Sequence, residues 1–161
     1  MSGGIAEEVE NLLREQGLTL ATAESATGGL IATMITDVPG SSDCFKGSVV
    51  SYANEMKMKV LGVKRETLEE HGAVSEQTAR EMAEGVRVLM DADISLSDTG
   101  IAGPGGATVH KPVGLFYLGL STKEGTIIQR HVFSGNRQEN KREAGEAALS
   151  MLKEYLSKFE K

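Results

Sequence analysis

The chain has 161 residues with a net charge of −6, 40% hydrophobic residues, 25% charged residues and one cysteine. These values are typical of a single globular domain, and we expect residues 1–161 to form it. The negative charge, together with the lack of a long apolar run or a signal-peptide pattern, predicts neither a nucleic-acid partner nor a membrane partner. The lone Cys44 excludes an intrachain disulfide and favours a cytoplasmic location.

Hydrophobic periodicity predicts helices and strands that alternate along most of the chain. In chain order we expect a helix at 4–16, a strand at 18–23, a helix at 30–35, a strand at 47–52, a helix from 53 to 62, a short helical connection at 63–73, a helix at 75–90, a strand at 92–98, strands at 112–121 and 126–133, and a helix at 136–161. The last two strands form a hairpin. This order predicts a three-layer α/β/α domain with a mixed, mostly parallel sheet whose antiparallel strand comes from the hairpin.

The segment between the first strand and its helix is the first candidate for a binding site. It contains the polar run 24–27 followed by Gly28 and Gly29. A strand, a turn of small residues and a helix aim backbone amides at an anion, and they raise the hydroxyl of Ser25 or Thr27 at the carboxyl end of the strand. The alternative is structural: Thr27 caps the helix and the glycines allow close packing.

A second candidate segment follows the strand expected at 92–98. Thr99 stands at the end of that strand, and the glycines after it allow several amides to converge on an anion; they are Gly100, Gly103, Gly105 and Gly106. The alternative is a flexible surface loop. If the two strands are parallel neighbours, Ser25 and Thr99 share one crevice.

A serine that attacks a carbonyl needs a base, and the chain has neither a Gly-x-Ser-x-Gly elbow nor a Ser-x-x-Lys motif at Ser25. Tyr52 closes the second expected strand, and Lys57 follows about one and a half helical turns later. A lysine shielded from water can accept a proton from a hydroxyl, and Tyr52 can relay that proton or hold the lysine. The alternative is that Lys57, like Lys59, is a solvated helix residue.

Metal and nucleotide-phosphate motifs are missing from the sequence. His71, His110 and His131 are far apart and have no metal-ligand spacing, and no Walker-type loop is present. We therefore expect no metal site and no cofactor.

Six ordered blocks together resemble a known family. They are Ala23-Glu24-Ser25-x-Thr27-Gly28-Gly29, Asp37-Val38-Pro39-Gly40-Ser41-Ser42, Tyr52-x-Asn54-Glu55-x-Lys57, His71-Gly72-Ala73-Val74-Ser75, Thr99-Gly100-Ile101-Ala102-Gly103-Pro104 and Lys111-Pro112-Val113-Gly114. From about Leu18 to Leu152 the chain resembles the C-terminal domain of the CinA competence/damage-inducible family, whose stand-alone members are nicotinamide-nucleotide amidases.

The resemblance implies metal-independent hydrolysis of nicotinamide mononucleotide to nicotinate mononucleotide and ammonia, in pyridine-nucleotide recycling. By position it implies Ser25 as nucleophile, Lys57 as general base and Tyr52 as their assistant, with Thr99 completing the polar site. The phosphate is expected on glycine-loop amides beside Arg137 or Arg142. The expected substrate-binding residues are Thr27, Gly28, Gly29, Asn54, Gly100, Gly103, Gly105, Gly106, Arg137 and Arg142.

Four positions depart from the family pattern. Ala26 stands where the family usually has Cys, Ala53 where it has Ser, and 134–137 reads Ser-Gly-Asn-Arg instead of Pro-Gly-Asp-Arg. These departures leave open a second function, a non-catalytic nucleotide-binding or regulatory module. Also open are whether Ser25 attacks directly or Ser25 or Thr99 positions a water, whether the substrate is a mononucleotide or a dinucleotide, and whether an apolar face of the terminal helices supports a homo-oligomer.

Overall fold

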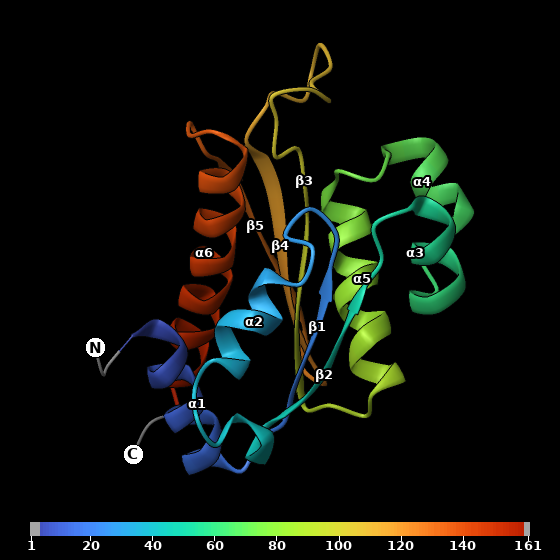
Figure 1. Ribbon diagram of the computed structural model, residues 1–161. Coiled ribbons are helices and arrows are strands. Elements are labelled where there is room, and N and C mark those ends of the chain that lie inside the picture. The colour runs from blue at the N-terminus through green and yellow to red at the C-terminus, as the bar shows by residue number, and fades with distance from the viewer. Residues whose placement is uncertain (1–3, 160–161) are drawn as a thin grey trace.

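Five strands and the helices around them form one layered structure in a computed structural model that describes residues 4–159 (Figure 1). The elements are α1 (Ile5–Gln16), β1 (Leu20–Glu24), α2 (Leu30–Thr36), the 3-10 turn η1 (Ser41–Asp43), β2 (Phe45–Val50), α3 (Asn54–Leu61), α4 (Arg65–His71), α5 (Glu76–Leu89), β3 (Ile94–Gly100), β4 (Leu115–Thr122), β5 (Gly125–Val132) and α6 (Arg137–Ser157). The predicted elements are all present, with most ends displaced by a few residues; positions 160–161 of the helix expected at 136–161 lie outside the described residues.

The sheet has the order β2-β1-β3-β4-β5. The strand pairs β1–β2 and β1–β3 are parallel, and β3–β4 and β4–β5 are antiparallel. Four strands therefore run in one direction and β4 alone runs in the other. This confirms the predicted mixed sheet, in which the hairpin supplies the antiparallel strand. The carboxyl ends of β1, β2 and β3 lie at one edge of the sheet.

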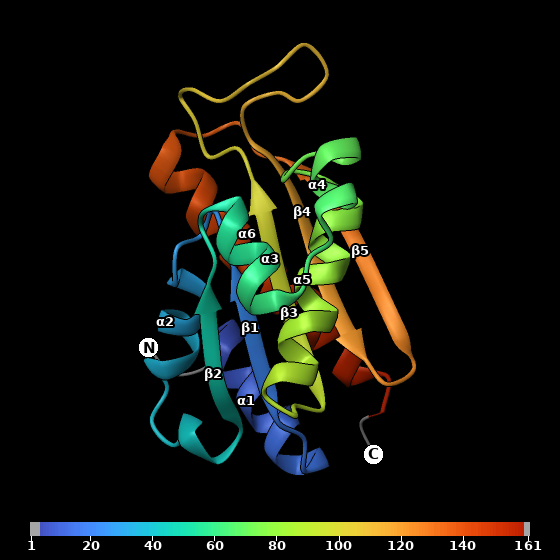
Figure 2. The same ribbon diagram turned by 90° about the vertical axis from the view of Figure 1, so that its right-hand side faces the viewer.

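Helices cover both faces of the sheet, which confirms the three layers. On one face lie α1, α2 and α6, and on the other lie α3, α4 and α5 (Figures 1 and 2). The loop between β3 and β4 extends beyond the carboxyl edge of the sheet (Figure 2). Within residues 4–159, no helix is both long enough and apolar enough to cross a membrane.

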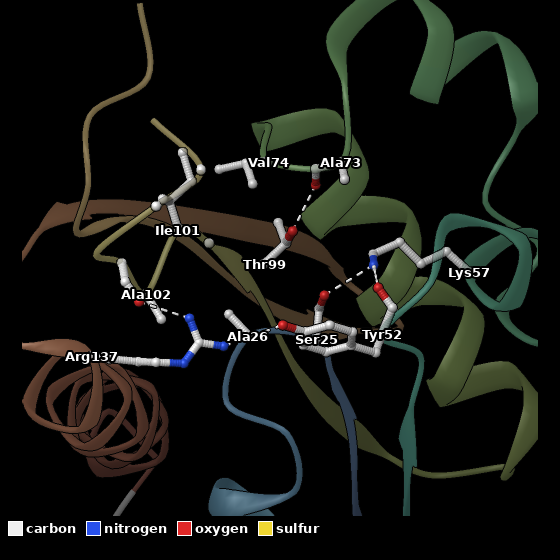
Figure 3. A pocket seen from close by; sticks show the side chains of 14 residues that line it. Ser25, Ala26, Tyr52, Lys57, Ala73, Val74, Thr99, Ile101, Ala102 and Arg137 are labelled. Carbon is white, nitrogen blue, oxygen red and sulfur yellow. Dashed lines mark hydrogen bonds between the residues drawn. The ribbon is translucent and has the colours of Figure 1, made fainter. Parts of the chain in front are cut away.

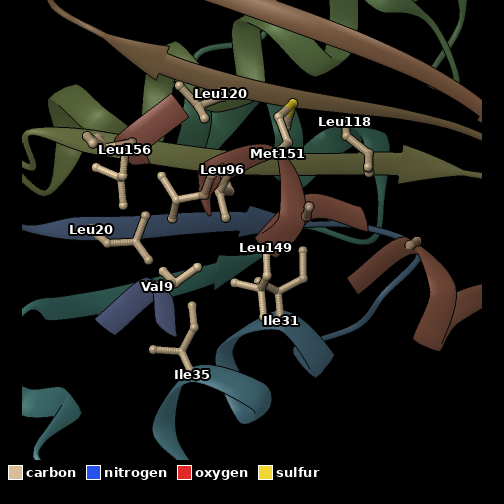
Figure 4. Packing of buried hydrophobic residues seen from close by; sticks show 14 of the residues in the cluster. Val9, Leu20, Ile31, Ile35, Leu96, Leu118, Leu120, Leu149, Met151 and Leu156 are labelled. Atoms are coloured by element: carbon tan, nitrogen blue, oxygen red, sulfur yellow. The ribbon is translucent and has the colours of Figure 1, made fainter. Parts of the chain in front are cut away.

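The larger hydrophobic core lies between the sheet and the helices α1, α2 and α6 (Figure 4). It contains Leu20, Leu96, Leu118, Leu149 and Leu152, which are all buried. The apolar face of α6 is part of this core, so it is not a free surface for a second copy of the chain. Cys44 also lies in this core, as a buried small residue.

Local sequence explains where α5 and α6 begin. Ser75 caps α5 by accepting a hydrogen bond from the Thr78 amide. Asn136 caps α6 in a capping box with Glu139. Asn caps helices about as well as Asp, so the departure from the family pattern at 136 preserves the cap. Ala53, in contrast, precedes α3 without any side-chain cap.

Candidate active site

A cavity of about 320 Å³ opens at the carboxyl ends of β1 and β3, under the loop that follows β3 (Figure 3). Its walls come from five separate segments. The lining residues are Ser25, Ala26, Tyr52, Lys57, Ala73, Val74, Thr99, Gly100, Ile101, Ala102, Gly103, Gly105, Gly106 and Arg137. The structure thus brings together Ser25 and Thr99, as predicted from the expected parallel strands.

Ser25 and Lys57 are in direct contact in this cavity. The Ser25 Oγ lies 2.9 Å from the Lys57 Nζ (Figure 3). The same Nζ donates to the backbone carbonyls of Ser51, at 2.9 Å, and Tyr52, at 3.0 Å. Because carbonyls only accept, they occupy two N–H groups of the lysine. The third position on the nitrogen faces Ser25, where it is an N–H in the charged lysine and a lone pair in the neutral one.

Lys57 is buried, with 1% of its surface exposed, so the interpretation as a solvated helix lysine is wrong. Burial lowers the pKa of Lys57 from its ordinary value of 10.5, and the negative charge of Asp98 opposes this shift. A lowered pKa makes the neutral amine more accessible near neutral pH. The pair therefore has the geometry and the electrostatics of a nucleophile and its general base.

Two buried carboxyl groups hold the turn that carries Ser25. Asp98 accepts hydrogen bonds from the amides of Ser25, at 3.0 Å, and Thr27, at 3.1 Å. Glu24 accepts from the amides of Gly29, at 3.0 Å, Ile31, at 2.9 Å, and Ala32, at 2.8 Å. Both carboxyl groups are completely buried. They fix the turn from β1 into α2 by satisfying its backbone donors.

This arrangement corrects the expectation that the amides at 27–29 hold an anion. Thr27 and Gly29 donate to Asp98 and Glu24, and Gly28 donates to the Ser25 carbonyl at 3.1 Å. The protein's own acidic side chains thus occupy the position of the ligand. Thr27 also does not cap α2: its hydroxyl points to the two carboxyl groups, and the residue before the helix is Gly29.

One amide of the turn stays available. Within residues 4–159 the Ala26 amide makes no hydrogen bond, and Ala26 lines the cavity directly after Ser25. An amide that follows the nucleophile is well placed to donate to the oxygen of an attacked carbonyl.

Thr99 and Tyr52 line the cavity in ways that the sequence did not specify. The Thr99 hydroxyl donates to the Ala73 carbonyl at 2.6 Å, so its lone pairs face the cavity as acceptors. Tyr52 holds Lys57 through its backbone carbonyl, whereas its phenol lies 3.3 Å from an Arg137 nitrogen. β2 ends at Val50, so Tyr52 belongs to the loop after the strand and 64% of its surface is exposed.

Arg137 reaches the cavity from the first turn of α6 (Figure 3). Its guanidinium donates to the Gly103 carbonyl at 2.8 Å. The buried Asn140 strengthens the same junction, because it donates to the Ala102 carbonyl at 3.0 Å and accepts from the Gly135 amide at 2.9 Å. These bonds tie α6 to the glycine-rich loop, so this part of the loop is not the freely flexible segment of the alternative interpretation.

Several predicted binding residues lie outside the cavity lining. Gly28, Asn54 and Arg142 are exposed, and Thr27 and Gly29 belong to the structural turn beneath it. Of the two arginines that remained open, Arg137 is the one at the cavity. Among residues 4–159, no group of three His, Cys, Asp or Glu side chains is arranged to hold a metal ion.

The sequence interpretation gave no role to Asp98, Asn140 or the Glu24 carboxylate. A signal existed for the two acids, because each stands in the final residues of a central strand, where a carboxylate has no place in an apolar core unless it is hydrogen-bonded. Asn140 had no such signal, since its position in a polar helical segment is typical of a surface residue.

The fold and the site together define an open α/β domain with a buried serine–lysine pair at the carboxyl edge of its sheet. Comparison with known proteins identifies the family: the model of the CinA C-terminal domain matches residues 3–156, and the chain belongs to that family. A CinA-like protein of Endomicrobium trichonymphae is 51% identical over 152 residues, which are 94% of this chain and 36% of that protein. The chain therefore spans little more than a third of the length of such curated relatives.

Solved structures agree with this assignment. The competence damage-inducible protein A of Klebsiella pneumoniae is 33% identical, with a TM-score of 0.94 over 97% of both chains. The competence/damage inducible protein CihA of Agrobacterium tumefaciens is 38% identical, with a TM-score of 0.86 over 98% of both chains.

Proposed function

We propose that the chain is an amidohydrolase that deamidates nicotinamide mononucleotide to nicotinate mononucleotide and ammonia, without a metal, in cytoplasmic pyridine-nucleotide recycling. The observation that carries the proposal is the 2.9 Å contact between Ser25 and a buried lysine at the floor of the cavity. The family resemblance supplies the substrate, and the site supplies a mechanism.

In the first step the Ser25 Oγ attacks the carboxamide carbon while its proton passes to the neutral Nζ of Lys57. The carbonyls of Ser51 and Tyr52 orient the lysine, so its lone pair points at the hydroxyl. The Ala26 amide donates to the oxygen on which negative charge develops. The carbon–nitrogen bond then breaks, and the proton on Lys57 leaves with ammonia.

In the second step water opens the resulting ester, with Lys57 taking a proton from the water and returning it to Ser25. The Thr99 oxygen, an acceptor toward the cavity, suits the N–H group of a carboxamide. Arg137, at the cavity wall, suits the phosphate of the mononucleotide because a guanidinium binds phosphate through two nitrogens.

Ammonia release from nicotinamide mononucleotide tests the proposal. The wild-type chain should turn over, and Ser25→Ala should lose nearly all activity while it still binds the mononucleotide in calorimetry. If the wild type binds the nucleotide without releasing ammonia, the chain is the non-catalytic module instead. Full activity in Ser25→Ala would remove Ser25 from the mechanism.

The same assay separates direct attack from water positioning. Hydroxylamine captures an acyl-enzyme as a hydroxamate, so wild-type enzyme should form the hydroxamate product if Ser25 attacks. If hydrolysis continues in hydroxylamine without formation of the hydroxamate, a water positioned by Ser25 or Thr99 is favoured.

A further inference from the structure

The turn beneath Ser25 contains a pair of buried carboxyl groups that the proposed mechanism does not use. The Thr27 hydroxyl lies between them, with its Oγ1 at 2.7 Å from a Glu24 oxygen and at 2.5 Å from an Asp98 oxygen. All three side chains are buried, with at most 1% of their surface exposed.

If Glu24 and Asp98 were both ionised carboxylates, this arrangement would lack one proton. A threonine hydroxyl has one proton and can donate to one oxygen only. If both acids were ionised, one carboxylate oxygen would face the lone pairs of Thr27 at hydrogen-bond distance, in an environment without water, which is strongly unfavourable. A second proton between the two acids resolves this conflict.

The remaining donors indicate which acid carries that proton. Glu24 receives three backbone amides, from Gly29, Ile31 and Ala32, which stabilise its ionised form. Asp98 receives two amides, from Ser25 and Thr27. The better-satisfied Glu24 is therefore the carboxylate, and Asp98 donates to Thr27, which in turn donates to Glu24.

We propose that Glu24, Thr27 and Asp98 hold one shared proton, and that this buried acid pair is a positioning unit for Ser25 and Lys57. Asp98 fixes the backbone of Ser25 through its amide, and its charge acts on Lys57. While Asp98 is protonated, the lysine gives up its proton more readily. When Asp98 ionises, the added negative charge stabilises the ammonium form and weakens the base.

The charged groups around Asp98 are consistent with this assignment. The charge of Glu24, on β1, acts on Asp98, and the charge of Asp98 acts in turn on Lys57 of α3, while the partner of Asp98 on β4, Leu118, does not ionise. Burial raises the pKa of Asp98 to about 6, and the negative charge of Glu24 adds to this shift, whereas the backbone amides of Ser25 and Thr27 oppose it.

A carboxyl NMR titration of the full chain tests the shared proton without any substrate. The sequence has only five aspartates, so ¹³C labelling of aspartate carboxyl carbons gives few signals, and Asp98→Asn identifies the signal of Asp98. In the wild type this signal should titrate near pH 6. Titration of all five aspartates below pH 5 would overturn the proposal.

Thr27→Val removes the bridging hydroxyl while it preserves the shape of the side chain. If Thr27 accepts the Asp98 proton, its loss should lower the Asp98 midpoint by about one pH unit, since protonated Asp98 loses its acceptor. If Thr27 merely donates to an ionised Asp98, the midpoint should rise instead. A higher or unchanged midpoint therefore contradicts the proposal.

Two further variants control this experiment. Thr22→Val removes a hydroxyl that lies 3.2 Å from Glu24 but does not touch Asp98, so it should change the Asp98 midpoint less than Thr27→Val does. Thr27→Ser keeps the bridge and should preserve the wild-type midpoint. If Thr27→Val does not fold, two other measurements decide the question. One is the wild-type titration. The other is an infrared C=O band of a neutral carboxylic acid, which should be present in the wild type and lost in folded Asp98→Asn; if the wild type lacks that band, the proposal is overturned.

The effect on Lys57 rests on the proposed function and has its own readout. In Thr27→Val the pH profile of ammonia release should differ from that of Thr22→Val around pH 6, where Asp98 titrates, whereas a purely structural loss would lower the rate equally at all pH values. If the two pH profiles coincide although the Asp98 midpoint has shifted, the proposed effect of Asp98 on Lys57 is overturned, but the shared proton stands. Lack of ammonia release in the wild type would overturn the proposed amidase alone.

Discussion

Lys57 and Ser25 are 32 positions apart in the sequence, yet the Lys57 nitrogen lies 2.9 Å from the Ser25 hydroxyl. Ser25 follows β1 directly, and Lys57 lies one helical turn into α3, which begins just after the neighbouring strand β2. The parallel pairing of β1 with β2 thus brings Ser25 and Lys57 to one edge of the sheet.

Replacing the base should remove most of the activity. A general base contributes roughly 10²–10⁴-fold to a rate, so Lys57→Met should lower kcat for ammonia release by about that factor. Methionine is apolar and of similar length, which suits the buried position. Lys59→Met is the matched control, because Lys59 is exposed on the same helix and should retain wild-type kcat. Equal losses in the two variants would contradict the role of Lys57.

The activity should rise with pH until Lys57 is neutral. Burial lowers the pKa of this lysine below 10.5, so kcat/KM should increase through a midpoint below that value. In Lys57→Ala this limb should vanish, and added methylamine should restore part of the rate in proportion to its neutral fraction. An unchanged alkaline limb in Lys57→Ala would assign the titration to another group.

Lys57 also makes stability depend on pH, with a definite sign. Its pKa is lower in the folded chain than in the unfolded one, so between the two values the unfolded chain binds more protons. The free energy of unfolding contributed by Lys57 therefore rises as pH increases through this window. Denaturant unfolding of the wild type and Lys57→Met across the alkaline range should show this dependence in the wild type only.

Much of the fold could be predicted because its signals are local. The capping serine of α5 and the alternating apolar residues of the strands depend on neighbouring positions only. The errors at strand ends arise because such local signals do not show the contacts that a strand end makes with other elements. β2 was expected to extend to Tyr52 and ends at Val50, because the last residues turn toward the cavity to present their carbonyls to Lys57.

The site could be predicted only in part, because hydrogen-bond partners are not local. Ser25 and Thr99 were expected together from the strand order, and Lys57 from its position after Tyr52 and the family resemblance; the structure places all three at one cavity. The amides at 27–29 were assigned to a ligand because the sequence does not show that Asp98, some 70 positions away, lies beneath the turn. A glycine-rich turn after a strand predicts donors for an anion, but not whether that anion belongs to the protein.

Arg137 and Arg142 should differ sharply in their effect on substrate binding. Arg137 lies at the cavity and Arg142 is exposed away from it. A hydrogen bond to a charged group is worth about 1.5–3 kcal/mol, so Arg137→Ala should raise KM for the mononucleotide by roughly 10- to 150-fold, with a smaller change in kcat. Arg142→Ala should leave KM unchanged.

The riboside that lacks the phosphate provides the control for this comparison. Its kcat/KM should respond little to Arg137→Ala, because the lost contact is the one to the phosphate. Equal losses for the riboside and the mononucleotide would show that Arg137 acts by holding the loop through the Gly103 carbonyl instead.

Ala53→Ser should stabilise the chain by capping α3. Ala53 has the extended backbone of an N-cap, φ −83° and ψ 148°, but no side-chain acceptor. Serine at such a position is worth about 0.5–2 kcal/mol relative to alanine. The denaturation midpoint should rise in Ala53→Ser and should not rise in Ala53→Val, which adds volume without an acceptor.

Gly85→Ala should destabilise the chain, although it replaces glycine by alanine inside a helix. Helix propensity alone favours alanine by about 1 kcal/mol. At Gly85, however, an added Cβ would lie 2.0 Å from the Leu61 carbonyl oxygen, where α3 ends against α5. Backbone at this distance has to move, so we expect a net loss of about 1–3 kcal/mol in the free energy of unfolding.

Gly145, inside α6, is the matched control for this prediction. An added Cβ there meets the Met34 sulfur, at 2.8 Å, near the end of a flexible side chain that can rotate away, and lies in ordinary contact with Leu30, at 3.9 Å. Gly145→Ala should therefore lose less stability than Gly85→Ala, since the gain in helix propensity is the same at both sites. Denaturant unfolding of the two variants measures the difference, and a larger loss at Gly145 would show that the contact between α3 and α5 adapts more easily than its backbone geometry indicates.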